Sequence, residues 1–68
     1  MYFNLDKNLK TAPISIEKDA FIGGGTIILK GVRIGEESVV GAGSVVTKSI
    51  PAKEIWADNP AKFIRKLE

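Results

Sequence analysis

The chain of 68 residues contains neither cysteine nor histidine. Without cysteine it can form no disulfide, and it offers no thiolate to bind a metal ion or to act as a nucleophile. Without histidine it lacks the side chain that most often serves as a general base near neutral pH. The composition therefore excludes disulfide-stabilised scaffolds and metal sites built from histidine or cysteine.

Charge and long apolar runs are also scarce. The net charge of +2 is too small to indicate a nucleic-acid partner. No apolar run approaches the ~20 residues of a membrane span, and Met1–Asp6 lacks the basic start and apolar core of a signal peptide. We therefore expect a soluble cytoplasmic protein that contacts no membrane. A core this small rarely supplies more than about 3–5 kcal/mol, so we expect the chain to associate with others.

From Ile16 to Pro51 the sequence reads as six consecutive hexapeptides. The second place is glycine in three of the six, and the fifth place is small or β-branched. The first place is always isoleucine or valine: Ile16, Ile22, Ile28, Ile34, Val40 and Val46. Alternating strands of an ordinary small β domain are the competing interpretation, but a period of two does not place glycines at a period of six.

A period of six has a simple structural explanation. In a short strand the first-place residue points inward and its neighbours point outward. A turn must follow, and a small fifth residue lets this corner close without crowding. Glycine relieves the backbone where it turns or where another group approaches closely. Stacked coils of this kind form a parallel β-helix with an interior of isoleucine and valine.

A family resemblance rests on two stretches, Ile34–Pro51 and Asn59–Lys66. Both are similar to the C-terminal end of the maltose, galactoside and polysaccharide O-acetyltransferases, which are hexapeptide-repeat acyltransferases. The resemblance extends from about Thr11 to Leu67. It implies an all-β fold, a left-handed parallel β-helix with three hexapeptides in each coil and so about two coils. The hexapeptide pattern alone does not determine the handedness.

Three segments are predicted along the chain. Residues 1–15 form an N-terminal lead-in or cap, residues 16–51 form the β-helix, and residues 52–68 form a loop and a short C-terminal α-helix. The loop covers Ala52–Asp58 and is anchored by Ile55 and Trp56. The helix would begin with Asn59 as its N-cap and Pro60 in its first position, and would carry an apolar face.

The small residues of Gly41–Ser44 leave backbone amides and carbonyls open to a ligand. The resemblance implies that this corner binds acetyl-CoA, a substrate whose thin pantetheine arm can pair with strand-edge backbone groups. Basic residues would meet its phosphates. The predicted cofactor-binding residues are Gly24, Ala42, Thr47, Lys48, Lys62 and Arg65. Plain coil geometry and a solvated basic face are the competing interpretations. The family often has glycine where Asp58 stands.

The resemblance implies transfer of an acetyl group from coenzyme A to a hydroxyl group, usually of a sugar. The family's catalytic histidine is absent, so no catalytic residue and no metal ligand is assigned. We expect the C-terminal, cofactor-binding portion of an acetyl-CoA-dependent O-acetyltransferase, inactive alone and assembled as a homotrimer. The alternative is a non-catalytic β-helix assembly or interaction module. A β-helical carbonic anhydrase is excluded because it needs histidine ligands for zinc.

Three outward positions have bland interpretations as well. Phe21 should point outward, where it covers a neighbouring chain or packs on the surface. Arg33 is predicted to be a solvated charge. Glu36 and Glu37 are predicted to be solvated rather than to form a catalytic carboxylate pair, because adjacent side chains diverge in a strand or bend.

Overall fold

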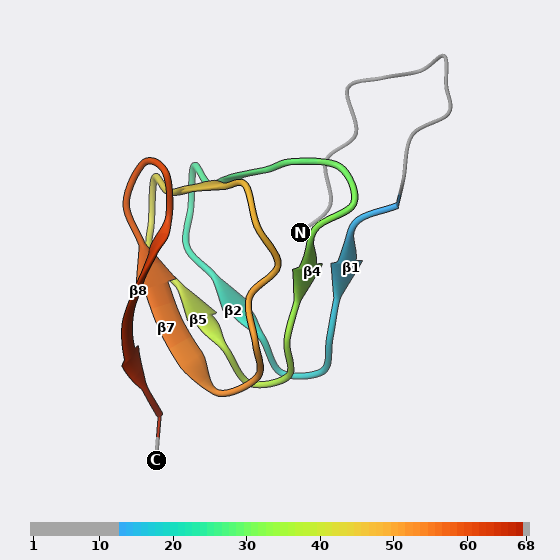
Figure 1. Ribbon diagram of the computed structural model, residues 1–68, viewed down its shortest axis with the longest axis vertical. Helices are drawn as coiled ribbons and strands as arrows, with labels where there is room; N and C mark the ends of the chain where they lie inside the picture. Colours follow the sequence, from blue (N-terminus) through green and yellow to red (C-terminus); the bar gives the residue numbers. More distant parts are fainter. Residues whose placement is uncertain (1–12, 68) are drawn as a thin grey trace.

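The computed structural model describes residues 13–67, and over this range its regular secondary structure consists of β-strands alone (Figure 1). The strands are β1 (Ser15–Ile16), β2 (Phe21–Ile22), β3 (Ile27–Ile28), β4 (Arg33–Ile34), β5 (Val39–Val40), β6 (Val45–Val46), β7 (Glu54–Ala57) and β8 (Lys62–Lys66). The predicted all-β fold is confirmed. Within this range no helix is long and apolar enough to cross a bilayer.

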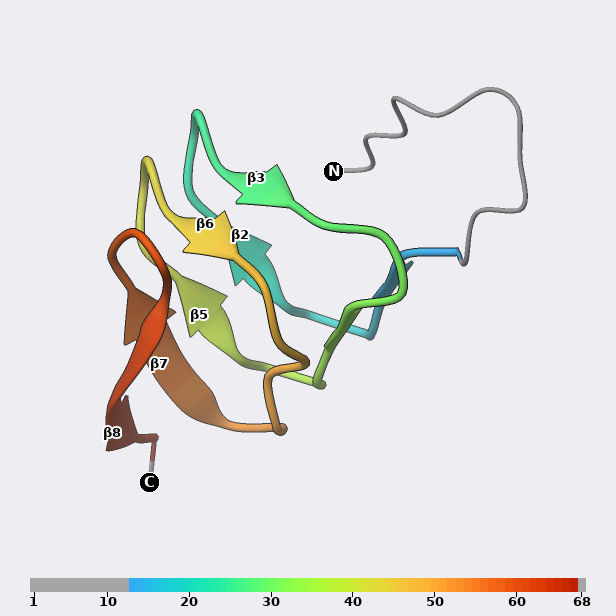
Figure 2. The same cartoon turned by 45° about the horizontal axis from the view of Figure 1, so that its top comes forward.

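The first six strands stack as two coils. Ser15 lies opposite Arg33, Phe21 opposite Val39 and Ile27 opposite Val45, all in parallel, an offset of 18 residues in each case. This offset equals three hexapeptides, so β1–β3 form the first coil and β4–β6 the second. Figure 2 shows β3 beside β6, and β2, β5 and β7 in succession. The molecule is a short parallel β-helix with three sides.

The first-place residues fill the interior, as predicted. Ile34, Val40 and Val46 have exposed fractions of 0%, and Ile28 is also buried. Ile16 and Ile22, in the first coil, are half-buried and pack against this core. Burial of each such side chain stabilises the fold by about 1.5–3 kcal/mol, so this row of residues is the main source of stability.

The corners show a signal that the sequence reasoning missed. The fourth residue of the first five hexapeptides has a positive φ: Asp19, Gly25, Gly31, Glu37 and Gly43, with values from 60° to 81°. Glycine adopts this left-handed conformation at little cost, which explains its recurrence there. The second-place glycines serve a different purpose, because there the neighbouring coil comes close.

Two fifth-place serines close their corners by hydrogen bonds. Both are 0% exposed. The Ser38 hydroxyl donates to the Gly35 carbonyl at 2.6 Å, and the Ser44 hydroxyl donates to the Gly41 carbonyl at 2.7 Å. Ser44 Oγ also accepts the backbone N–H of Asp58 at 3.1 Å. Ser44 therefore links the second coil to the segment that follows β7, whereas Ser38 makes only a local bond.

Replacing Ser44 by alanine is expected to destabilise the chain more than replacing Ser38. Ser38→Ala removes one local hydrogen bond, worth about 1 kcal/mol. Ser44→Ala also leaves the Asp58 N–H without its acceptor, so we expect a loss of about 2–3 kcal/mol. The free energies of unfolding are to be measured in urea. Equal losses in the two variants would show that the Ser44–Asp58 bond does not contribute.

The third coil is shorter than the hexapeptide pattern predicts. Ile50 was assigned to a fifth place, but it bridges to Ile34, an offset of 16 residues. The Gly35 N–H donates to the Ile50 carbonyl at 2.7 Å, and the Ile50 N–H donates to the Arg33 carbonyl at 2.8 Å. Ile50 thus takes the inward role of a first-place residue and is 2% exposed.

The predicted loop and C-terminal helix are wrong. Four residues of the loop form β7, in which Ile55 lies opposite Val39 and Trp56 opposite Val40. Trp56 is inward and packs against the core, so its anchoring role is confirmed. In place of the helix, β8 pairs antiparallel with β7. An eight-residue helix is marginal alone, whereas the free edge of β7 offers β8 a ladder of hydrogen bonds.

A bulge shapes the β7–β8 hairpin. Phe63 lies opposite Trp56 and Arg65 opposite Ile55, so Ile64 is the extra residue between them. The Trp56 and Phe63 rings meet edge to face with centroids 6.3 Å apart. Of the predicted N-terminal segment 1–15, residues 1–12 lie outside the described residues, and the first strand already begins at Ser15.

Candidate functional site

Two glycine-rich turns stack at one corner of the β-helix. We call Gly23–Gly25 and Gly41–Gly43 together the glycine corner. The Gly43 N–H donates to the Gly24 carbonyl at 2.9 Å. A Cβ built on Gly23 would lie 2.5 Å from the Ala42 nitrogen, so the two turns are in close backbone contact. Gly24 and Ala42 are nevertheless exposed, which leaves their outer backbone accessible.

The residues after β7 continue this corner by one more layer. A Cβ on Gly41 would lie 2.9 Å from the Cβ of Ala57. The Val45 N–H donates to the Asp58 carbonyl at 3.1 Å, and the Ala61 N–H donates to the Val45 carbonyl at 2.8 Å. In Figure 2 the β2–β3, β5–β6 and β7–β8 connections lie one after another at this end. Residues 58–61 therefore occupy the outer edge of β6.

Asp58 has a backbone conformation that favours glycine. Its φ is 100°, in the left-handed region. The resemblance to the O-acetyltransferases places glycine here in many members, and the conformation explains that preference. The Asp58 carboxylate accepts the N–H of Asn59 at 3.0 Å, and this hydrogen bond supports the aspartate in the turn. The Asn59–Pro60 peptide is cis.

One side of the β-helix adjoins the glycine corner and is apolar. We call it the β3–β6 side. Its outward side chains include Ile27 and Leu29, with exposed fractions of 45% and 44%. Val45 is half-buried beside Ile27, and Thr47 is exposed at the far end of β6. Exposed large apolar groups that lie next to one another mark surfaces for a ligand or a partner chain.

The predicted cofactor residues divide between the two ends of this side and the hairpin. Gly24 and Ala42 lie together at the glycine corner, and Lys62 lies opposite Ala57, which adjoins that corner. Thr47 and Lys48 follow β6 at the opposite end, and both are exposed. Arg65 is separate from the others because its register with Ile55 places it on the β2–β5–β7 side.

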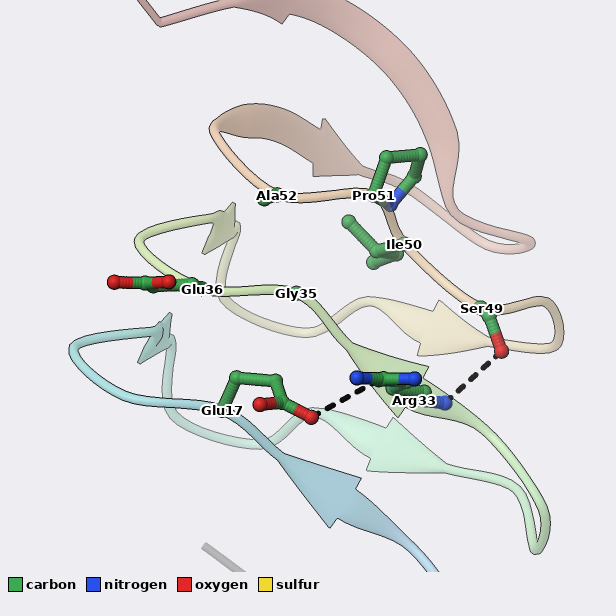
Figure 3. A pocket seen from close by; sticks show the side chains of 8 residues that line it. All are labelled: Glu17, Arg33, Gly35, Glu36, Ser49, Ile50, Pro51 and Ala52. Atoms are coloured by element: carbon green, nitrogen blue, oxygen red, sulfur yellow. Dashed lines mark hydrogen bonds and ion pairs between the residues drawn. The ribbon is translucent and has the colours of Figure 1, made fainter.

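A pocket that the sequence reasoning did not predict lies on the third side, over β1, β4 and Ile50 (Figure 3). Arg33 Nε donates to Glu17 Oε2 at 2.9 Å. The Arg33 N–H donates to Ser49 Oγ at 3.0 Å. The Arg33 side chain is 68% exposed, so it is solvated as predicted but is also paired. Exposed pairs of this kind contribute little stability. None of the predicted cofactor residues lines this pocket.

The adjacent carboxylates Glu36 and Glu37 lie in different surroundings. Both are exposed. Glu36 lies at the margin of the pocket, and its side chain points away from Glu17 and Arg33 in Figure 3. Glu37 Oε1 lies 3.8 Å from Lys53 Nζ. This arrangement agrees with the interpretation that the two are solvated charges.

Comparison with known proteins identifies relatives of this β-helix. A family model described as the hexapeptide repeat of succinyl-transferase matches residues 13–48. A Schizosaccharomyces pombe protein, provisionally named an acetyltransferase, is 55% identical over 56 residues. The alignment covers 82% of this chain and 27% of that protein.

Solved structures agree with this result. A maltose O-acetyltransferase from Clostridium difficile 630 is 47% identical, with a TM-score of 0.82 over 84% of this chain and 30% of its own. A hexapeptide-repeat acetyltransferase from Vibrio cholerae O1 biovar eltor, complexed with acetyl-CoA, is 44% identical. Its TM-score is 0.82 over 84% of this chain and 31% of its own.

The chain therefore spans less than a third of the length of these relatives. Its coils share their fold, the left-handed parallel β-helix, at a TM-score of 0.82. The family model covers more than half of the chain, and it covers the same hexapeptides whose first-place residues fill the interior. The chain belongs to the hexapeptide-repeat acyltransferase family.

Proposed function

We propose that this chain is the acetyl-CoA-binding, C-terminal portion of an O-acetyltransferase. The observation that supports this most directly is the glycine corner, where two stacked turns leave the backbone of Gly24 and Ala42 exposed beside an apolar side. A relative that is 44% identical is complexed with acetyl-CoA. The proposed reaction moves the acetyl group from the thioester of coenzyme A to a hydroxyl group.

The cofactor would lie along the β3–β6 side. Pantetheine is extended and carries two amides, which suits the accessible backbone of the glycine corner. Its alkyl segments suit the exposed side chains of Ile27 and Leu29. At the far end of β6, the Thr47 hydroxyl and the Lys48 ammonium would meet polar groups and phosphate. Lys62, beside the corner, and Arg65 are further cations proposed for the phosphates.

A neighbouring chain would supply the second wall of this groove. The β2–β5–β7 side, which meets the β3–β6 side at the glycine corner, is also apolar. Phe21 lies in register with Val39 and Ile55 on it and is 63% exposed. Two apolar sides that share a corner suit an assembly in which each chain contacts two others. We propose a homotrimer, whose three equivalent interfaces each hold one cofactor.

The 68 residues carry no histidine to act as general base for the acceptor hydroxyl. The proposal is accordingly that the chain binds acetyl-CoA but does not turn it over alone. The similarity to a maltose O-acetyltransferase makes a sugar hydroxyl the proposed acceptor. A non-catalytic assembly module is the second candidate, and the exposure of Phe21, Ile27 and Leu29 favours it because these groups suit self-association.

Lys48→Ala is expected to weaken coenzyme A more than pantetheine. A charge-assisted hydrogen bond to phosphate contributes about 1.5–3 kcal/mol, so we expect a loss of roughly 10- to 100-fold in affinity for coenzyme A. Pantetheine has no phosphate after the pantoyl group and should bind both proteins equally. Affinities for coenzyme A, dephospho-coenzyme A and pantetheine are to be obtained from the ligand-dependent rise in melting temperature.

Lys18→Ala is the matched control. Lys18 is an exposed lysine at the turn between β1 and β2, away from the β3–β6 side, and its loss should leave all three affinities unchanged. Equal losses for all three ligands in Lys48→Ala would contradict the phosphate role. No ligand-dependent rise at millimolar acetyl-CoA, in a folded oligomer, would favour the assembly module over the cofactor site.

A further inference from the structure

The first coil is open at one end of the β-helix. Among residues 13–67, β1 pairs only with β4, β2 only with β5, and β3 only with β6. The other edge of each of these strands has no partner strand in this part of the chain. The three free edges lie around the same end of the triangular coil. Unpaired strand edges are templates for pairing with another chain.

The direction of the backbone amides defines which groups are free. The N–H groups of Ser15 and Glu17 donate to the second coil, at 3.1 and 2.9 Å. Those of Phe21, Gly23, Ile27 and Leu29 do the same. Successive N–H groups along a strand alternate in direction. The intervening amides therefore point out of the open end, and they belong to Ile16, Ile22 and Ile28.

The interior of the first coil is also incompletely covered. Ile14, Ile16 and Ile22 pack against the core but are only half-buried. Ile34 and Val40, directly above Ile16 and Ile22, are 0% exposed. The open end thus combines three hydrogen-bonding edges with an apolar centre. Its occupant must offer strand edges at the same three positions and an apolar centre of its own.

The opposite end of the molecule cannot be that occupant. There β8 pairs with β7, and residues 58–61 lie along β6. Trp56 and Ala61 pack against the core, and Ile50 beneath them is 2% exposed. This end offers no three-edged opening. In a second copy of the chain the only surface with three matching free edges is the same open end.

The sequence just upstream does not continue the hexapeptide pattern. Counting back from Ile16 in steps of six, the first places fall on Lys10 and Asn4. A lysine and an asparagine cannot line the apolar interior without leaving polar groups unpaired. The pattern therefore breaks at the open end.

We propose that two copies of the chain join through their open ends. A two-fold axis perpendicular to the β-helix would bring the same surface of each copy together. The amides of Ile16, Ile22 and Ile28 would then pair across the interface, and the half-buried isoleucines would become buried. This contact is separate from the two apolar sides proposed for the trimer and does not depend on acetyl-CoA binding.

Amide hydrogen exchange tests the proposal on the unmodified chain. At millimolar concentration we expect the amides of Ile16, Ile22 and Ile28 to exchange at least ~100-fold more slowly than at a micromolar concentration at which the joined copies separate. The amides of Glu17, Gly23 and Leu29 are the internal controls, because they bond within the chain and should stay protected at both concentrations.

Chemical synthesis provides a second test that keeps every side chain. An N-methyl group on Ile22 blocks a free-edge donor without removing an internal hydrogen bond, and it should halve the assembly mass measured by sedimentation. An N-methyl group on Glu36, an exposed turn residue, should not change that mass. Three outcomes would overturn the proposal: no protection of the three amides at any concentration, equal protection in a monomeric chain, or an unchanged mass after N-methylation of Ile22.

Discussion

Replacing Gly23 by alanine is expected to unfold much of the population, whereas the same replacement at Gly24 is expected to be tolerated. A Cβ at position 23 would lie 2.5 Å from the Ala42 nitrogen and 2.6 Å from its Cα. Both are backbone atoms of the next coil, so no side-chain rotation can relieve the clash. The Gly23 N–H donates to the Val40 carbonyl at 2.8 Å, and the coils would have to separate there.

The expected loss for Gly23→Ala is roughly 1–3 kcal/mol or more, the usual range for overpacking. Against a total of about 3–5 kcal/mol for a chain of this size, that loss removes most of the stability. At Gly24 no atom lies within 4 Å of the added Cβ, and φ is outside the left-handed region. Urea unfolding of the two variants is the measurement. Equal midpoints would show that the coils adjust without cost.

Replacing Ile34 by alanine is the second change with a large expected effect. Ile34 is 0% exposed and lies between Ile16 in the first coil and Ile50 in the third. Truncation would leave a cavity in the middle of the interior, and such changes cost about 2–5 kcal/mol. We expect the variant to lose its cooperative unfolding transition at room temperature.

Ile64→Ala is the matched control because it removes the same atoms from an exposed position. Ile64 is 55% exposed at the bulge of β8, and its truncation should change the free energy of unfolding by less than about 0.5 kcal/mol. The two variants are to be compared by the melting temperature and by the sharpness of the transition. A stable Ile34→Ala variant would mean that the stack of isoleucine and valine is not the main source of stability.

The coils themselves could be predicted from the sequence because their cause is local. Each hexapeptide contains its own strand, its own turn and one inward residue, and the same unit recurs at Ile28, Ile34, Val40 and Val46. Knowing the inward residue of one unit therefore gives the inward residue of the next. The offset of 18 residues follows once three units make a coil, and it places Gly24 and Ala42 at one corner.

The end of the chain could not be predicted because its structure depends on distant partners. Ala61, Ile64 and Leu67 recur at helical spacing, yet the available edge of β7 decided for a strand. A one-residue bulge then shifted the alternation, so that Phe63 and Arg65 lie on opposite sides of the hairpin. The two-residue shortening before Ile50 has no signature in composition, since Thr47, Lys48 and Ser49 also fit a normal turn.

The candidate site was predictable in part for the same reason. The backbone exposure at Gly24 and Ala42 follows from glycine-rich turns in consecutive coils. The separation of Lys62 from Arg65 does not, because both were placed on one face of a helix that is absent. Their distance from the cofactor stays a prediction. The pocket between Glu17, Arg33 and Ser49 arises only when three coils are stacked, and no single hexapeptide indicates it.

The stacking of coils also determines how the molecule would yield to force. Each strand of the first six pairs with its counterpart one coil away, so a turn of the spiral touches only its immediate neighbours. Tension applied to the two termini would peel the spiral one turn at a time. The antiparallel hairpin fastens the last turn to the one before it. Unravelling would consequently start from the N-terminal turn and reach the hairpin last.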